Sequence, residues 1–226
     1  MKFRNSSMEK SQNWLYLFSS LILTILFSCT MNPKSIYSTD YTKKIVKITM
    51  RDGIELNTEV YTPNYSGENL PILLTRTPYG LRHDNSGIHS SLSTSYKELA
   101  EDKYIFVFQD IRGRYGSGGK FSMLRTPIKE DPDAEVDEAT DTYDTVEWLL
   151  DNLDKHNSKV GILGISYGGW LTAIALTDLH PAVKAISPQA SPSDMYMGDD
   201  FYHNGAFRLA PSFGYAAMME RSKENY

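Results

Sequence analysis

The sequence predicts an α/β fold with a mostly parallel sheet and antiparallel strands at its N-terminal side. Two observations indicate this fold. An alternating hairpin pattern opens the globular part, and short apolar strands then alternate with helical segments. Strands that alternate with helices are typical of parallel sheets, because each parallel connection has to cross over the sheet. The chain has 226 residues, which is enough for one sizeable core.

The antiparallel part is predicted at residues 45–50 and 54–61, where polar and apolar residues alternate. Asp52-Gly53 joins the two runs and supplies the positive φ angle that a tight hairpin turn needs. A short apolar run at residues 71–76 then predicts a buried strand. The globular fold is therefore expected to begin near Lys44.

The remaining elements follow from runs of apolar residues and from their spacing. A polar loop is expected over residues 81–95, and a further loop from residue 110 to about residue 137. Between and after these loops the expected elements are a helix at 95–102, a strand at 104–109, a helix at 139–153, a strand at 160–165, a helix at 167–179 and a strand at 182–187. The domain is thus predicted over 44–190, and residues 191–226, which lack strand alternation, are expected to start a helical cap.

The first 30 residues resemble a bacterial lipoprotein signal. Three basic residues lie among the first 13, an apolar stretch covers residues 14–27, and the single cysteine, Cys29, follows it. This pattern predicts lipidation of Cys29, a polar tether over residues 31–43, and a membrane-anchored domain in the bacterial periplasm or cell envelope. The alternative is an uncleaved N-terminal anchor, which would also place the domain outside the cytoplasm.

Composition excludes several classes of function. The net charge is −5 and the basic residues form no stripe, which argues against a nucleic-acid partner. One cysteine allows no internal disulfide. The glycine-rich loop at 113–119 has Arg114, and not glycine, six residues before Lys120, so it is not a phosphate-binding P-loop. We expect no metal and no cofactor, and a homo-oligomer is left open.

The pattern Gly-x-Ser-x-Gly occurs at Gly164-Ile-Ser166-Tyr-Gly168, and Gly169 follows it. An apolar strand precedes the pattern and a helical segment follows it, as in a nucleophile elbow. In an elbow, a sharp turn exposes the serine oxygen, and small flanking residues avoid clashes between strand and helix. Ser166 is therefore the candidate nucleophile, and a tight structural turn is the alternative.

A serine nucleophile needs donors for the oxyanion that forms during acyl transfer. The backbone N–H of Tyr167, directly after Ser166, is one expected donor. The second donor is expected in the loop after the third strand, where the hydroxyl of Tyr79 is available. The spacing alone leaves open whether Tyr79 donates there or only packs in a turn.

Four motifs in order resemble the cocaine esterase and X-prolyl dipeptidyl-peptidase family of α/β-hydrolases. They are RTPYG at 76–80, QDIRGRYGSG at 109–118, GISYGG at 164–169 and GDDFYHNGAFR at 198–208. The resemblance implies an α/β-hydrolase fold and assigns Tyr79 to the oxyanion hole. Within the family, residues 198–200 are most similar to α-amino-acid ester hydrolases, in which a carboxylate cluster holds the substrate's α-ammonium group. This implies a substrate-binding role for Asp200 first, with Asp199 beside it; a solvated acidic turn is the alternative.

In this family the catalytic acid and histidine follow the serine, after later strands. Only one strand is expected after Ser166, and neither partner is identifiable before Tyr226, so we interpret the sequence as the N-terminal part of a longer enzyme. The predicted function is a serine hydrolase that cleaves esters or amides of α-amino acids, in small molecules or peptides, through an acyl-enzyme on Ser166. The alternatives are an X-prolyl dipeptidyl-peptidase and a truncated, non-catalytic surface lipoprotein.

Overall fold

The computed structural model describes residues 40–65, 67, 69–131 and 133–220. The predicted signal segment, Cys29 and most of the predicted tether lie outside these residues. Among the residues that are described, no helix is both long enough and apolar enough to span a bilayer.

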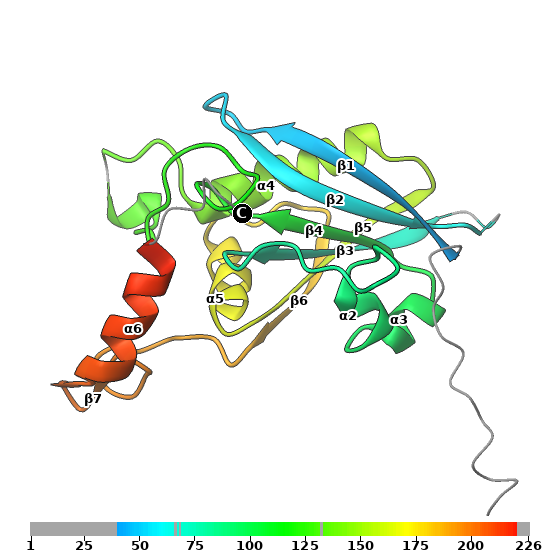
Figure 1. Ribbon diagram of the computed structural model, residues 1–226. Helices are drawn as coiled ribbons and strands as arrows, with labels where there is room; N and C mark the ends of the chain where they lie inside the picture. The colour runs from blue at the N-terminus through cyan, green and yellow to red at the C-terminus, as the bar shows by residue number, and fades with distance from the viewer. Residues whose placement is uncertain (1–39, 66, 68, 132, 221–226) are drawn as a thin grey trace, which may run out of the picture. The chain divides into compact units, whose positions relative to one another are not determined.

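A six-stranded sheet with the order β1-β2-β4-β3-β5-β6 forms the centre of the fold (Figure 1). The pairs β1–β2 and β2–β4 are antiparallel, whereas β4, β3, β5 and β6 run parallel to one another. This confirms the predicted fold class, a mostly parallel sheet with antiparallel N-terminal strands. The strands are β1 (Tyr41–Thr49), β2 (Glu55–Pro63), β3 (Leu70–Thr77), β4 (Ile105–Asp110), β5 (His156–Ile165) and β6 (Val183–Gln189).

Strand β1 begins at Tyr41, three residues before the expected start of the domain at Lys44. Tyr41 pairs with Pro63 of β2, and its ring is buried. Its hydroxyl donates a hydrogen bond to the carbonyl oxygen of Ala100, at 3.0 Å. Residues 41–43, which were predicted as tether, therefore belong to the sheet, because a buried aromatic side chain anchors them.

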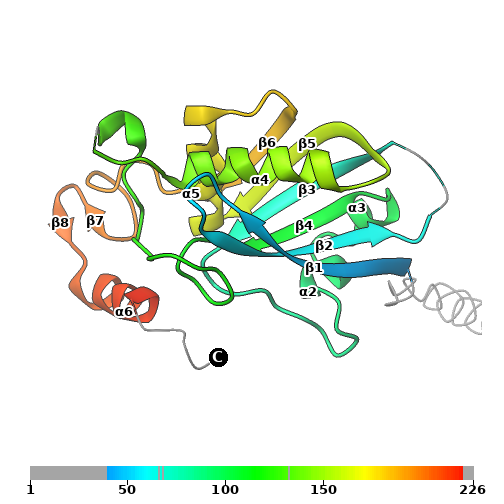
Figure 2. The same ribbon diagram turned by 90° about the horizontal axis from the view of Figure 1, so that it is seen from above.

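The two faces of the sheet carry separate cores, as the alternation along β4 illustrates. Ile105 and Val107 face a core that includes residues of α4 (Glu138–Asn152), while Phe106 and Phe108 face a core that includes residues of α2 (Ser90–Ser93) and α3 (Lys97–Glu101). Successive side chains of a strand point to opposite faces, so both faces of this buried strand are apolar. Figure 2 shows α4 and α5 (Tyr167–Ile174) on one side of the sheet and α2 on the other.

The two longer helices of the domain, α4 and α5, begin within one residue of the expected positions. Helix α4 starts after Asp137, whose side chain accepts a hydrogen bond from Thr140 N at 2.8 Å and completes a capping box. Helix α5 is shorter than expected, because a 3-10 helix, η3 (Ala175–Asp178), replaces its last turn. Two short elements inside expected loops are new: helix α2 and the 3-10 helix η2 (Ile128–Glu130).

The tail contains a small hairpin that was not predicted from the sequence. Strands β7 (Tyr202–His203) and β8 (Ala206–Phe207) pair around Asn204 and Gly205, which both have positive φ. Asn-Gly is the preferred pair for such a turn, so the signal was present in the sequence. Helix α6 (Leu209–Glu220) follows and provides the helix that was expected in the cap region.

Candidate active site

Ser166 occupies a sharp turn between β5 and α5. Its φ and ψ angles are 59° and −119°, and residues other than glycine rarely adopt such a positive φ angle. The backbone N–H of Ser166 donates to Gln189 O of β6 at 2.9 Å, and Ser166 O accepts from Trp170 N at 3.0 Å. Ser166 itself is exposed. The turn therefore presents the serine outward at the carboxyl end of the parallel strands, in a strained conformation of the kind that is typical of functional sites.

The glycines around Ser166 differ in whether the position could hold a side chain. A Cβ atom on Gly164 would lie 2.0 Å from Gly168 O, and one on Gly169 would lie 2.3 Å from Gln189 O. A Cβ atom on Gly168 would meet only Arg76 O, at an ordinary 3.4 Å. The predicted steric requirement thus holds for Gly164 and Gly169, while Gly168, the second glycine of the pattern, has room for a methyl group.

Tyr167 is the first residue of α5, where backbone N–H groups have no acceptor within the helix. Its side chain points elsewhere: the ring is buried, and the hydroxyl accepts a hydrogen bond from Leu124 N at 2.8 Å. Burial raises the pKa of this hydroxyl well above its ordinary value, so the phenol stays neutral. The buried ring fixes the start of the helix and leaves the backbone N–H as the group available beside Ser166.

Tyr79 lies in the loop after β3, as predicted. Its N–H donates to Thr77 Oγ1 at 3.1 Å, and its hydroxyl lies 2.9 Å from the hydroxyl of Tyr215 in α6. The loop borders a cavity of about 420 Å³, to which Tyr79 and the elbow residues Gly164 and Gly168 contribute. The structure therefore places Tyr79 beside the elbow, on the wall of this cavity and with its hydroxyl at that of Tyr215.

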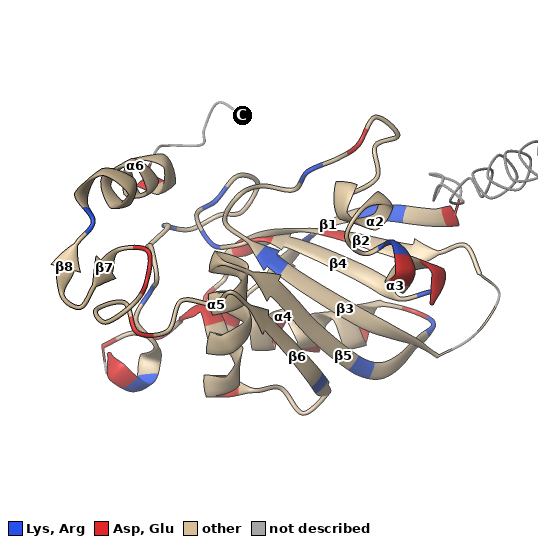
Figure 3. Ribbon diagram, turned by 90° about the horizontal axis from the view of Figure 1, so that it is seen from below, with Lys and Arg blue, Asp and Glu red and all other residues tan. Residues whose placement is uncertain are grey.

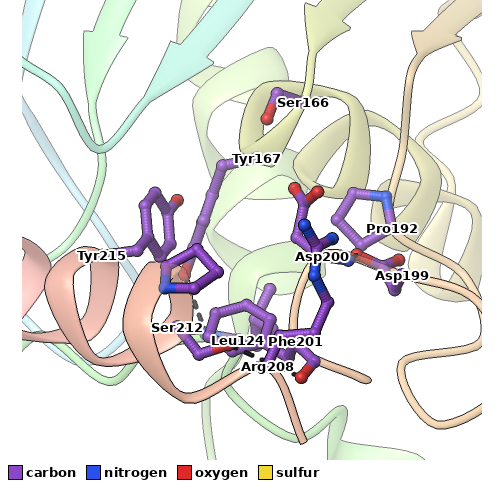
Figure 4. A pocket seen from close by; sticks show the side chains of 11 residues that line it. Leu124, Ser166, Tyr167, Pro192, Asp199, Asp200, Phe201, Arg208, Ser212 and Tyr215 are labelled. Carbon is purple, nitrogen blue, oxygen red and sulfur yellow. Dashed lines mark hydrogen bonds between the residues drawn. The ribbon is translucent and has the colours of Figure 1, made fainter. Parts of the chain in front are cut away.

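A pocket of about 230 Å³ contains Ser166 and both acidic candidates. The two aspartates belong to the segment directly before β7, where the ribbon is red in Figure 3. Helix α6 lines another side of the pocket (Figure 4). The fold thus brings together two groups that are 34 residues apart in the chain, Ser166 and Asp200. The lining residues are Leu124, Ser166, Tyr167, Pro192, Asp199, Asp200, Phe201, Arg208, Pro211, Ser212 and Tyr215.

The two aspartates have different surroundings. Asp199 accepts hydrogen bonds from Ser193 N at 3.3 Å and from Asp200 N at 2.6 Å, so its carboxylate holds the local turn. Asp200 is exposed, and no hydrogen bond or ion pair within the described part of the chain occupies its carboxylate. Asp200 is therefore the more available of the two for a ligand.

Arg208 and Tyr215 are among the pocket residues that were not identified from the sequence as site residues. Arg208 was quoted only as the end of a motif, and Tyr215 only as part of an aromatic-rich tail. The two histidines after Ser166 do not line this pocket. His180 is buried and pairs with Glu147 at 2.6 Å, and His203 belongs to the β7–β8 hairpin. Among the described residues, no group of His, Cys, Asp and Glu side chains could hold a metal ion.

A buried charge cluster lies behind the elbow. Arg76 Nη2 is 3.2 Å from Glu138 Oε2, and Arg112 bridges Asp141 at 2.6 Å and Asp52 at 2.5 Å. Burial raises the pKa of Glu138 above its ordinary value, although Arg76 opposes this shift. Each arginine pairs with a buried carboxylate of α4, Arg76 with Glu138 and Arg112 with Asp141, and these pairs hold α4 against the sheet.

Asp110 should make stability depend on pH. Burial raises the pKa of this carboxyl to about 6, despite hydrogen bonds from Asn57 at 3.1 Å and from Gly116 N. Because its folded pKa exceeds the unfolded one, Asp110 stabilises the fold when protonated, and this contribution disappears as the pH rises from about 4 to about 6. We expect Asp110→Asn to stabilise the protein by roughly 2–3 kcal/mol at pH 8 and not at pH 4.

Urea unfolding at the two pH values measures this difference. Asp52→Asn is the opposite control, because the hydrogen bond from Arg112 lowers the pKa of Asp52. That variant should be less stable than the wild type at pH 8, with a smaller difference at low pH. A pH-independent effect of Asp110→Asn would contradict the prediction.

Comparison with known proteins identifies the family. The family described as X-Pro dipeptidyl-peptidase (S15 family) matches residues 52–225, which is most of the chain. The chain belongs to the S15 family. This confirms the resemblance that the four motifs indicated.

The chain is also similar to esterases and to an aminopeptidase. Cocaine esterase from Rhodococcus sp. (strain MB1 Bresler) is 31% identical over 179 residues, which cover 77% of this chain and 28% of the esterase. The structure of an α-amino acid ester hydrolase matches with 38% identity and a TM-score of 0.75, over 86% of this chain and 33% of that one. An aminopeptidase from a marine sediment archaeon (Thaumarchaeota archaeon) matches with 39% identity and a TM-score of 0.73, over 86% and 32%. The chain thus spans about a third of the length of these similar proteins.

Proposed function

We propose that this protein is a serine hydrolase that cleaves esters or amides of α-amino acids through an acyl-enzyme on Ser166. One observation carries the proposal: a single pocket holds both the strained elbow serine and the exposed carboxylate of Asp200. The similarity to an α-amino acid ester hydrolase and to an aminopeptidase supports the same substrate class.

The proposed reaction uses the elbow as follows. Ser166 Oγ attacks the substrate carbonyl and passes its proton to a general base, which the described residues do not supply in the pocket. The Tyr167 N–H and the Tyr79 hydroxyl donate hydrogen bonds to the oxyanion. The bond to the leaving alcohol or amine then breaks, the leaving group takes up the proton, and water hydrolyses the acyl-enzyme.

Asp200 sets the acyl specificity in this proposal. A carboxylate at the pocket wall pairs with the α-ammonium of an aminoacyl group through a charge-assisted hydrogen bond. A simple acyl ester has no such group and gains nothing from Asp200. Selectivity for aminoacyl substrates is therefore expected to come from this side chain and not from the elbow.

Replacing Asp200 with asparagine tests the proposal in the full-length protein. We expect KM for an amino-acid p-nitroanilide or ester to rise roughly 10- to 100-fold, because a charged hydrogen bond is lost. KM for p-nitrophenyl acetate should stay within about twofold. Asp199→Asn is the matched neighbour and should have the smaller effect, because its carboxylate serves the turn. Equal effects of Asp200→Asn on both substrates would remove the ammonium role.

The S15 match also supports the second candidate, an X-prolyl dipeptidyl-peptidase. This enzyme would release an X-Pro dipeptide from an N-terminus, so its acyl site must take a proline next to the scissile bond. Comparing an X-Pro amide with a simple α-amino-acid ester separates the two. Faster turnover of the X-Pro amide would favour the peptidase.

A further inference from the structure

The hydroxyl groups of Tyr79 and Tyr215 lie 2.9 Å apart, and either could be the donor. Tyr79 belongs to the loop after β3, while Tyr215 belongs to α6 and lines the pocket of Ser166. Figure 4 shows the Tyr215 side chain extending from α6 at the edge of this pocket. Its ring packs edge-to-face on Phe201, with the ring centres 5.9 Å apart. The contact links two segments that are 136 residues apart in the sequence.

A buried arginine fixes the same two segments a second time. Arg114 Nε donates to Pro78 O at 2.8 Å, and Arg114 Nη1 donates to Met219 O at 2.5 Å. Pro78 precedes Tyr79, and Met219 lies in the last turn of α6, where backbone carbonyls lack helical partners. Tyr79, Tyr215 and Met219 also share one apolar cluster. The geometry of the tyrosine pair is therefore held from both sides.

We propose that Tyr215 is a positioning residue for the oxyanion hole, and that it donates its hydroxyl hydrogen to Tyr79 Oη. A hydroxyl has one hydrogen and two lone pairs, so only one of the two tyrosines can donate across the contact. When Tyr215 donates, the hydrogen of Tyr79 is free to point at the oxyanion. Accepting a hydrogen bond also makes Tyr79 a stronger donor. The proposal rests on the proposed function in one respect, the role of Tyr79.

The ionisation of Tyr215 leaves its hydroxyl able to donate. Burial raises the pKa of Tyr215 above its ordinary range, and the hydrogen bond to Tyr79 adds to the shift. A raised pKa keeps the hydrogen on Tyr215 throughout the neutral and mildly alkaline range. The residue can therefore donate at every pH at which a serine hydrolase of this kind would be assayed.

A double-mutant cycle on the full-length protein tests the proposal, with p-nitrophenyl acetate as substrate. We expect Tyr215→Phe to lower kcat about tenfold with KM within about twofold, since one supporting hydrogen bond is lost and the ring packing stays. Tyr79→Phe should lower kcat about 100-fold or more, as for loss of an oxyanion-hole donor. Adding Tyr215→Phe to Tyr79→Phe should then change kcat by less than about twofold.

The cycle separates a positioning role from a structural one. An equal loss of kcat from Tyr215→Phe with and without the Tyr79 hydroxyl would overturn the proposal, and so would an unchanged kcat in the single variant. Tyr196→Phe, an exposed tyrosine of the same tail, is the matched control and should leave kcat unchanged. The acetyl ester has no ammonium group, so the result does not depend on the proposed aminoacyl specificity. Failure of the serine mechanism itself would be visible separately, as hydrolysis that persists after Ser166 is replaced.

Discussion

Replacing Ser166 with alanine in the full-length protein is expected to lower kcat for ester hydrolysis by roughly 10⁵- to 10⁶-fold. Loss of a serine nucleophile has an effect of this size, because the remaining binding and oxyanion groups supply only a small part of the acceleration. The exposed position of Ser166 at the elbow, with its positive φ angle, is the reason to expect the whole effect at this residue. Few other single changes should affect activity as strongly.

A fluorophosphonate probe measures the same prediction without a choice of substrate. Ser166 Oγ would attack phosphorus, the P–F bond would break, and fluoride would leave, so that the label remains on the serine. Ser212→Ala is the matched control, because Ser212 is a buried serine that lines the same pocket. Wild type and Ser212→Ala should be labelled, and Ser166→Ala should not. Equal labelling of all three proteins would refute the nucleophile assignment.

The strands of the sheet and the helices α4 and α5 could be predicted because their signals are local. The alternation in β1 and β2, the apolar run of β4 and the capping residues of α4 are all readable within about 15 residues. The exact start of β1 was not readable in this way. Tyr41 joins the sheet because its hydroxyl reaches Ala100, which lies 59 residues away. The residues next to Tyr41 in the sequence are mostly polar and give no sign of that contact.

The site shows the same division between local and distant information. Ser166 and its glycines form a contiguous pattern, and the Asp199-Asp200 segment was found through the family motif. Tyr215 belongs to no sequence pattern of its own. The role proposed for it depends on a contact with Tyr79, which lies 136 residues earlier in the chain. Arg208 enters the pocket only because the β7–β8 hairpin turns the chain back, and the Asn204-Gly205 pair could have indicated that turn.

The glycines of the elbow give the second large prediction, one of stability as well as activity. Gly164→Ala places a methyl carbon 2.0 Å from Gly168 O, and Gly169→Ala places one 2.3 Å from Gln189 O. Both neighbours are backbone atoms, so the strand and helix themselves would have to move apart. We expect each variant to lose about 3 kcal/mol of folding free energy, the upper end of what overpacking costs, together with most of the reactivity of Ser166.

Gly168→Ala is the matched control within the same motif. Its methyl carbon would lie 3.4 Å from Arg76 O, an ordinary contact, and alanine is favoured over glycine inside a helix such as α5. This variant should therefore keep the wild-type urea midpoint or raise it, and keep its labelling by a fluorophosphonate. Gly164 and Gly169 are thus required where strand and helix cross, whereas position 168 has room for alanine. Gly164→Ala with the wild-type urea midpoint would contradict this explanation, and so would an equal loss of stability in Gly168→Ala and Gly164→Ala. Either result would mean that steric packing does not determine which elbow positions need glycine.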